Sequence, residues 1–404
     1  MTIKKPTIHS MNRRSYHCDY SRPGIYHITL KAAEALRHPL GKVVGDINMP
    51  VGTPEAPHVE LTPVGQMVEQ ELLHSITAHY PMMEVQDYVI MPEHMHFIIK
   101  AHQSIISKNG HTMDLGKVIA GYKYGCNRRW WAMTGRMKDQ RTEENQRTEA
   151  TGTCVASCSA AGNPGTGSLP SLFAEGFTDV IPLSKEELEQ KREYIHANPR
   201  SRLLRSSKKE WLQPQRGGID PALTLPALRG YLQRECAPSQ CSMEALDVIK
   251  SHLMVADGKI ACDSYGNREL LSRHCLPVVC HRKYARRLEE QKQHCLKAAE
   301  QGAVLVSARI AKGEQEIIDE AVDHGFPVVM ISDNGFPEIY HPSAERIERC
   351  ATGQLLCVTP WKYRYRPKDE SITVAECKTM NCIAQALCRT RDSWWMDNSQ
   401  RGNR

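Results

Sequence analysis

Two histidines one residue apart are the clearest sign of chemistry in this sequence. His94 and His96 lie in the run Met91-Pro-Glu-His-Met-His-Phe-Ile-Ile-Lys100. Alternate side chains of an extended strand share a face, so both imidazoles point to the same side. Neutral imidazole is a common ligand of divalent transition metals, and this pair would supply two of the three ligands of an open site. The alternative is two ordinary histidines on a sheet, so the pair needs partners elsewhere in the chain.

The segment Glu193-Tyr-Ile-His-Ala-Asn-Pro199 offers such partners. Tyr194 and Asn198 are four residues apart, so they share one face of a helix. If that face looks toward the histidines, a divalent ion held by two nitrogens and the Asn198 oxygen would act as a Lewis acid on a phosphate. The phenol could then attack phosphorus and keep hold of the cleaved strand as a phosphotyrosine ester. The structural alternative is a tyrosine that packs in the core.

The elements expected around these residues alternate between strands and helices. Apolar spacing predicts a strand at 24–31, a helix at 63–77, strands at 84–91 and 94–100, a helix at 114–131 and a strand at 171–181. Ser184 and Glu187 form a capping box that begins a further helix. We expect this helix to end before Pro199, because proline disfavours helical geometry in the residue before it. Residues 134–170 lack periodicity and are interpreted as a flexible insertion.

Positive charge gathers at two places near these elements. In the helix at 114–131, bases alternate with aromatic residues, a pattern that could neutralise phosphates and stack on unpaired bases. The alternative is a solvated helix whose aromatic residues face the core. A second basic cluster follows the tyrosine and suits phosphate contacts. The candidate DNA-binding residues are therefore Lys117, Lys123, Arg128, Arg129, Arg200, Arg202 and Arg205.

Length and composition indicate an intracellular protein of two domains. The chain has 404 residues and a formal net charge of +6, which permits nucleic-acid binding without requiring it. Its first thirty residues lack the apolar segment of a secretory signal, and no run is long enough to span a membrane. We therefore expect a cytoplasmic protein without membrane association. The 15 cysteines are spread through a long chain, which favours reduced thiols over disulfides.

The histidine run and the later tyrosine segment together resemble the HUH single-tyrosine transposases, especially those associated with repetitive extragenic palindromes. The resemblance covers roughly residues 20–210. It implies an α+β ferredoxin-like domain, with an antiparallel sheet and helices on one face. It also implies Tyr194 as the nucleophile, His94 and His96 as ligands of Mg²⁺ or Mn²⁺, and Asn198 as a third, polar ligand. The partners implied are single-stranded or hairpin DNA and a second copy of the chain, so the protein would be a nucleoid-associated homodimer. The long insertion before the tyrosine departs from the family pattern.

The C-terminal part of the sequence has a different pattern. Strands at 302–307, 326–331 and 354–358 alternate with helices at 312–324 and 344–351, which predicts a mainly parallel sheet covered by helices. This α/β half vaguely resembles the Rossmann-like domains of DNA-processing and lysine-decarboxylase-like proteins. The loop at 307–314 could present helix amides to a phosphate, and Asn334-Gly335 at the carboxyl edge is a second candidate.

These observations predict three segments and one function. The segments are a transposase domain at 1–215, a linker at 216–245 and a Rossmann-like domain at 246–404. The expected function is metal-dependent nicking and strand transfer on single-stranded or stem-loop DNA through a covalent 5′-phosphotyrosine. Two alternatives remain open, a non-catalytic protein that binds DNA hairpins and a metal-dependent phosphodiesterase that uses water.

Overall fold

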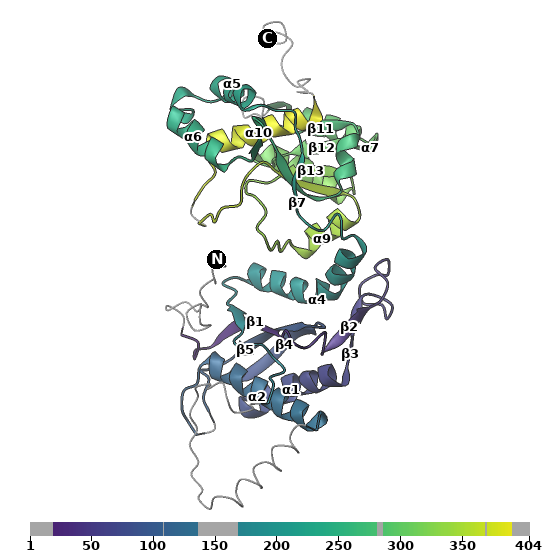
Figure 1. The fold of residues 1–404 in the computed structure, drawn as a ribbon, viewed down its shortest axis with the longest axis vertical. Coiled ribbons are helices and arrows are strands. Elements are labelled where there is room, and N and C mark those ends of the chain that lie inside the picture. Colours follow the sequence, from purple (N-terminus) through teal and green to yellow (C-terminus); the bar gives the residue numbers. More distant parts are fainter. Residues whose placement is uncertain (1–18, 108, 136–168, 281–285, 368–369, 390–404) are drawn as a thin grey trace, which may run out of the picture. The chain divides into compact units, whose positions relative to one another are not determined.

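The computed structural model divides the chain into two compact units, Met1–Leu203 and Leu204–Arg404. It describes residues 19–107, 109–135, 169–280, 286–367 and 370–389 (Figure 1). The predicted insertion at 134–170 lies almost wholly outside the described residues. Within them, no helix combines the length and the apolar character that crossing a membrane requires.

The first unit is built on a four-stranded antiparallel sheet whose strand order is β4-β5-β1-β6. Its strands are β1 (Gly24–Lys31), β4 (Met83–Ile90), β5 (His94–Ala101) and β6 (Thr178–Val180). A separate hairpin pairs β2 (Gly41–Val44) with β3 (His58–Leu61). The predicted antiparallel sheet is confirmed, although only three residues of the strand predicted at 171–181 join it.

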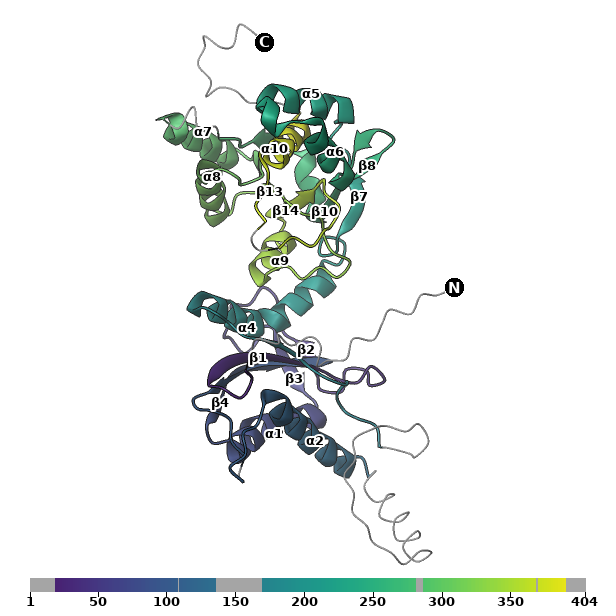
Figure 2. The ribbon, with the colours of Figure 1, turned by 90° about the vertical axis from the view of Figure 1, so that its left-hand side faces the viewer.

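Two helices, α1 (Pro63–His79) and α2 (Leu115–Met133), cover one face of this sheet (Figures 1 and 2). The Thr62 and Asp114 side chains cap their first turns by accepting backbone N–H groups. Apolar side chains spaced three and four residues apart on the helices meet alternate side chains of the strands, so one core forms between the layers. Its fully buried members include Leu72, Ile76, Met95, Phe97, Ile99, Ile119 and Tyr122.

Helix α4 (Lys185–Ser207) covers the opposite face of the sheet with its first turns. Ser184 accepts the backbone N–H of Glu187, as predicted, whereas the Glu187 carboxylate accepts the backbone N–H of Leu183, one residue before the predicted donor. The prediction that the helix ends before Pro199 is wrong. Proline removes the hydrogen bond to the Ile195 carbonyl, at a cost of about 3 kcal/mol. Burial of Ile195 and Pro199 at this point offsets that cost, and the helix continues.

The second unit contains a six-stranded mixed sheet of order β11-β12-β13-β14-β10-β7. The first four strands run parallel, and β10 and β7 are antiparallel to their neighbours. The strands are β7 (Gln215–Ile219), β10 (Cys262–Gly266), β11 (Cys275–Pro277), β12 (Val304–Ser307), β13 (Val328–Ile331) and β14 (Leu355–Thr359). The predicted mainly parallel sheet is confirmed, and its two antiparallel strands were not foreseen. A further hairpin pairs β8 (Val255–Ala256) with β9 (Lys259–Ile260).

Helices cover both faces of this sheet (Figure 2). Helices α7 (Leu288–Glu300) and α8 (Lys312–Asp323) pack on one apolar face, with α9 (Ala344–Ala351) beside β14. The other face is covered by α5 (Leu225–Glu235), α6 (Met243–His252) and α10 (Val374–Cys388). The segment 216–245, expected to be a linker, is part of this unit instead. It holds most of β7 and all of α5, whose Leu228 and Leu232 are buried in the core.

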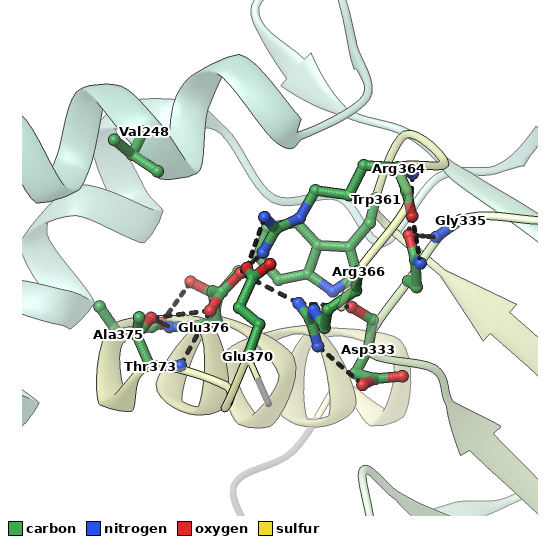
Figure 3. A network of polar contacts seen from close by, with 12 residues as sticks. Val248, Asp333, Gly335, Trp361, Arg364, Arg366, Glu370, Thr373, Ala375 and Glu376 are labelled. Carbon is green, nitrogen blue, oxygen red and sulfur yellow. Dashed lines mark hydrogen bonds and ion pairs between the residues drawn. The ribbon is translucent and has the colours of Figure 1, made fainter. Parts of the chain in front are cut away.

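An ionic network fixes the first turn of α10 (Figure 3). The Glu376 carboxylate, 6 % exposed, caps the helix by accepting from the backbone and hydroxyl of Thr373. It also accepts from Arg364 and Arg366, and Arg366 reaches Asp333 at 2.9 Å. All of these charges pair within the protein, so we assign the network a structural role.

Candidate active site between the first sheet and helix α4

The histidine pair points away from the core of the first unit. Met95 and Phe97 of β5 lie in the core under α1 and α2, so His94 and His96 project from the opposite face. The β1 register pairs Thr29 with His96 and Lys31 with His94, which places these two side chains on the same face. The predicted common orientation of the two imidazoles is therefore present, and their ring centroids lie 4.9 Å apart.

Tyr194 of α4 meets these histidines edge-on. Its ring centroid is 5.1 Å from that of His96, with an angle of 80° between the ring planes. His96 is 6 % exposed and Tyr194 is 38 % exposed. The tyrosine thus lies between the buried imidazole and solvent, where a polymer too large to enter the protein can reach it. The contact joins two elements about one hundred residues apart in the sequence.

Two ion-paired anchors hold α4 against the sheet. Asp87 of β4 accepts from Arg192 at 3.0 Å and lies 3.1 Å from the His196 ring nitrogen. Glu93, in the turn before β5, accepts from Arg202 at 2.9 Å. The Asp87 anchor holds the turns of α4 that carry Tyr194. The Glu93 anchor holds the helix two turns further on, so together they fix the position of the tyrosine over the sheet.

Burial keeps the central imidazoles neutral. Burial, with smaller contributions from the nearby His94, His27 and Lys191, lowers the pKa of His96 to about 3. The Thr29 hydroxyl lies 2.9 Å from Nδ1 of His96 and fixes the orientation of its ring. A neutral ring with one nitrogen engaged in this way offers the other nitrogen to an electrophile or a metal ion.

His27 is a member of this cluster that the sequence prediction missed. It lies on β1, is 5 % exposed, and stacks on His96 with centroids 5.3 Å apart and planes at 22°. Both of its ring nitrogens are buried without a hydrogen-bond partner in the described residues, which typically costs about 1–3 kcal/mol. Burial, together with the charge of Lys191, lowers its pKa to about 4. Alternation along 24–31 places His27 on the face of Thr29, but the sequence does not show that β1 pairs with β5.

The donors present suit a divalent ion in part. His94 and His96 could supply two nitrogen ligands, because their rings lie side by side. The Asn198 side chain donates from Nδ2 to the Tyr194 carbonyl at 3.2 Å, and a turned amide would present its oxygen instead. Across the described ranges, no three His, Cys, Asp or Glu side chains are grouped to hold a metal ion. A third ligand must therefore come from a donor outside those residue types or from a side chain that turns.

The basic residues predicted on α2 lie on the opposite side of the sheet from Tyr194. Lys123 donates to the carbonyls of Ala174 and Gly176, and burial lowers the pKa of its ammonium group. Arg129 pairs with the Glu71 carboxylate, which is almost wholly buried. Both cations thus have structural partners. Lys117 and Arg128 are exposed, and Arg128 lines an open pocket of about 570 Å³ between α1 and α2.

The aromatic residues of α2 divide between core and surface. Trp130 is buried, and Trp131 is half-buried and donates to the Pro170 carbonyl at 2.7 Å. Tyr122 is buried in the core, whereas Tyr124 is 62 % exposed. The alternative interpretation, in which the aromatic residues of this helix face the core, therefore accounts for most of them.

The three arginines after Tyr194 are only partly open to a ligand. Arg200 reaches the Met49 carbonyl at 3.5 Å, and Arg202 is paired with Glu93. Arg205 belongs to the second unit, where its charge acts on Tyr265. Two further cations on the side of the sheet that carries the tyrosine, Lys31 and Lys191, were not among the predicted contacts.

The second unit brings together the two loops suggested for a phosphate. Both line an open pocket of about 680 Å³ at the carboxyl edge of β12 and β13. The amides at the start of α8 are occupied, however. The Glu314 carboxylate, 1 % exposed, accepts from Ile310 at 2.7 Å, Cys280 at 3.0 Å and Ala311 at 3.3 Å. The expectation that these amides bind a phosphate is therefore wrong, because a side chain of the protein already fills the anion position.

Comparison of the chain with family models, with curated proteins and with solved structures found no match.

Proposed function

We propose that the first unit is a metal-dependent DNA-nicking and strand-transfer domain of the HUH single-tyrosine type. The observation that carries the proposal is the edge-on contact of Tyr194 with His96, 5.1 Å between centroids, on the face of the sheet opposite the core under α1 and α2. Tyr194 lies beside two neutral imidazoles and is itself partly exposed to solvent. A tyrosine in this position could attack a phosphodiester bond of a long substrate.

The order of elements supports this proposal. The chain runs β1, α1, β4, β5, α2, β6, and the sheet order is β4-β5-β1-β6. This is the order expected of a ferredoxin-like domain with an added hairpin and an added helix, α4. For the second unit we propose a Rossmann-like domain, on the basis of its four parallel strands with helices on both faces. Its pocket at the carboxyl edge has no assigned ligand.

Each residue of the site has its own role in the proposed reaction. The Tyr194 oxygen attacks phosphorus, and the bond from phosphorus to the 3′ oxygen breaks. The products are a 5′-phosphotyrosine and a free 3′-hydroxyl. The phenolic proton passes to water, since Tyr194 is partly exposed, and the departing 3′ oxygen takes up a proton from water. His94 and His96, with the Asn198 oxygen, would hold Mg²⁺ or Mn²⁺, which when bound withdraws charge from the phosphate.

Lys191 and Lys31 determine how the phosphate approaches. Lys191 lies one helical turn before Tyr194, and its charge acts on both His27 and His96. Lys31 lies beside His94 in the strand register. Two cations beside the neutral imidazoles favour binding of a polyanion. We therefore propose that single-stranded or hairpin DNA crosses this face, with α2 contacting only a longer substrate.

A homodimer is part of the proposal. The contact between Tyr194 and His96 lies within one chain, so each subunit would use its own tyrosine. Two such sites could cut and rejoin two ends of one DNA segment. This arrangement accounts for strand transfer, whereas one site accounts only for nicking.

The decisive experiment is a test for a covalent adduct. The protein is incubated with labelled single-stranded DNA from its own genomic flanks and with Mn²⁺, and then denatured. We expect a labelled band that survives denaturation, and we expect Tyr194→Phe to lose both the band and the nick. Tyr124→Phe, a change at an exposed tyrosine on α2, is the matched control and should behave as the unchanged protein.

The same experiment separates the alternatives. DNA retained in a native gel without any adduct or nick would favour a protein that only binds hairpins. Nicking that survives Tyr194→Phe would favour a phosphodiesterase that uses water. Either result would overturn the proposed role of Tyr194.

A further inference from the structure

The pocket at the carboxyl edge of the second sheet contains a cation without a counterion. Arg346 of α9 lines this pocket and is half-buried. Among the residues that the structure describes, its guanidinium donates only to the Tyr340 hydroxyl, at 2.8 Å, and no carboxylate pairs with it. The nearby titratable groups are Tyr340 and the thiols of Cys350 and Cys357, which are neutral at pH 7 at their ordinary pKa values. The pocket therefore offers one uncompensated positive charge.

Two other arginines at this pocket are neutralised by carboxylates. Arg309, which also lines it, pairs with both oxygens of Asp319, at 2.6 and 2.8 Å. Arg366 neutralises Asp333, a carboxylate in the pocket wall, at 2.9 Å (Figure 3). Arg346 differs from both, and it lies in the first turn of α9, where the helix dipole disfavours a cation. A charge kept at this electrostatic cost indicates an anion that binds from outside the chain.

Apolar side chains make up much of the remaining wall. Ile310, Met330 and Met380 line the pocket, and methionine adapts to ligands of different shape. The Tyr340 hydroxyl accepts from Arg346 and so can donate its own proton to a ligand. The pocket volume of about 680 Å³ lies within the range of small-molecule sites. An occupant should thus combine an apolar body with an anionic end.

The charges in the pocket wall favour a single negative charge on this end of the ligand. Arg346 supplies one positive charge, whereas Asp333 in the same wall would repel a dianion. A carboxylate carries one charge at pH 7 and accepts two parallel N–H bonds from a guanidinium, whereas a phosphate monoester carries nearly two charges. We propose that this pocket binds a small carboxylic acid with an apolar body, whose carboxylate pairs with Arg346 and accepts from the Tyr340 hydroxyl.

Titration calorimetry of the full, unchanged chain tests this assignment without depending on the folding of a variant. The probes are 3-phenylpropionate and indole-3-propionate, each compared with its amide, which has the same body without the charge. We expect an acid to bind at least roughly tenfold more tightly than its amide, because the amide cannot form the charged hydrogen bonds. AMP and inorganic phosphate should bind more weakly than the acid. Equal binding of acid and amide, no binding of either acid, or tighter binding of AMP would each overturn the proposal.

Variants then locate the binding site. Arg346→Gln removes the charge and should weaken binding of the acid by roughly tenfold or more. Tyr340→Phe keeps a ring that packs on Phe336, with 4.8 Å between centroids, and removes one donor, so we expect a loss of roughly threefold to tenfold. Arg229→Gln, at an exposed arginine of α5 that lines a different pocket, is the matched control and should bind as the unchanged protein does. Unaltered binding by Arg346→Gln would overturn the proposal, because the acid would then bind elsewhere.

Discussion

At the scale of single residues, the candidate site is a contrast between buried imidazoles and an exposed phenol. His27 and His96 are almost completely buried, and their lowered pKa values keep both rings neutral at physiological pH. Tyr194 lies over them with more than a third of its surface open to solvent. Neutral nitrogens bind metal, and an open phenol reaches a phosphate, so each group is placed where its proposed task requires.

Thr29 gives a first prediction at this scale. Its hydroxyl lies 2.9 Å from Nδ1 of His96 and fixes that ring. Thr29→Val keeps the shape of the side chain but removes this contact, and we expect Mn²⁺ affinity to fall by roughly tenfold. Titration calorimetry measures the change. Thr178→Val, on the exposed strand residue paired with Thr29, should leave the affinity unaltered, and equal affinities for all three proteins would refute the proposed role.

Glu93 gives a prediction about pH. The neighbouring His94 imidazole lowers the pKa of the carboxyl group to about 2, with help from Arg202 and His38. Because the folded pKa lies below the ordinary value of 4.5, this carboxylate stabilises the protein above that pH and ceases to do so as pH falls toward 2. Its side chain is one third exposed, so solvent screening limits the effect to about 1 kcal/mol.

Denaturant unfolding of the metal-free protein checks this point. The free energy of unfolding should be about 1 kcal/mol lower for Glu93→Gln than for the unchanged protein at pH 7. The difference should shrink as pH falls below 4.5. A difference that is constant across this range, or that grows in acid, would show that Glu93 does not act through its charge.

At the scale of elements, the placement of α4 decides whether the site exists. Its sequence predicted a helix that begins at Ser184, and the Ser184 hydroxyl caps the first turn as expected. The continuation past Pro199 was not predictable, because it depends on tertiary burial that outweighs a local penalty. The contacts of Arg192 and His196 with Asp87 could not be predicted from the sequence either, since they join residues more than one hundred positions apart.

Asp87 provides the prediction at this scale. Asp87→Asn removes the charge that binds Arg192 and His196, so α4 should loosen and Tyr194 should lose its alignment. A displacement of about 1 Å can cost up to roughly a hundredfold in rate, and we expect the rate of adduct formation to fall by roughly tenfold or more. Mn²⁺ affinity should change little, because His94 and His96 lie on the sheet.

The control for Asp87 is Glu84→Gln on the same strand, where the carboxylate pairs with the exposed His102. Single-turnover measurement of the labelled adduct compares the three proteins. Equal rates for Asp87→Asn and the unchanged protein would show that this anchor does not position the tyrosine.

At the scale of the whole molecule, the chain is two units with separate cores. The pattern of strand and helix in the second half predicted α8, α9 and three of the parallel strands, because buried parallel strands are continuous apolar runs. The antiparallel strands β7 and β10 escaped prediction, since β7 contains two glycines and β10 is rich in polar residues. The prediction of a linker at 216–245 was wrong for the same reason, because the sequence of β7 shows no strand pattern.

This division predicts that residues 1–207 fold alone and keep the activity. The fragment contains the first core, the four members of the cluster and the whole of α4. We expect its circular dichroism to show cooperative thermal unfolding and its rate of adduct formation to lie within about threefold of that of the full chain. A fragment that folds but forms no adduct would show that the second unit contributes to the reaction.

The claim on which all of this depends is that Tyr194 becomes covalently joined to DNA. Trypsin cleaves after Arg192 and after Arg200, which isolates the tyrosine in the peptide Glu193–Arg200. Mass spectrometry of the digested, nuclease-trimmed adduct should find a nucleotide phosphate on that peptide and on no other. An adduct located on a different peptide, or intact DNA and an unmodified Glu193–Arg200 peptide with every divalent metal tested, would contradict the assignment of Tyr194 as the nucleophile.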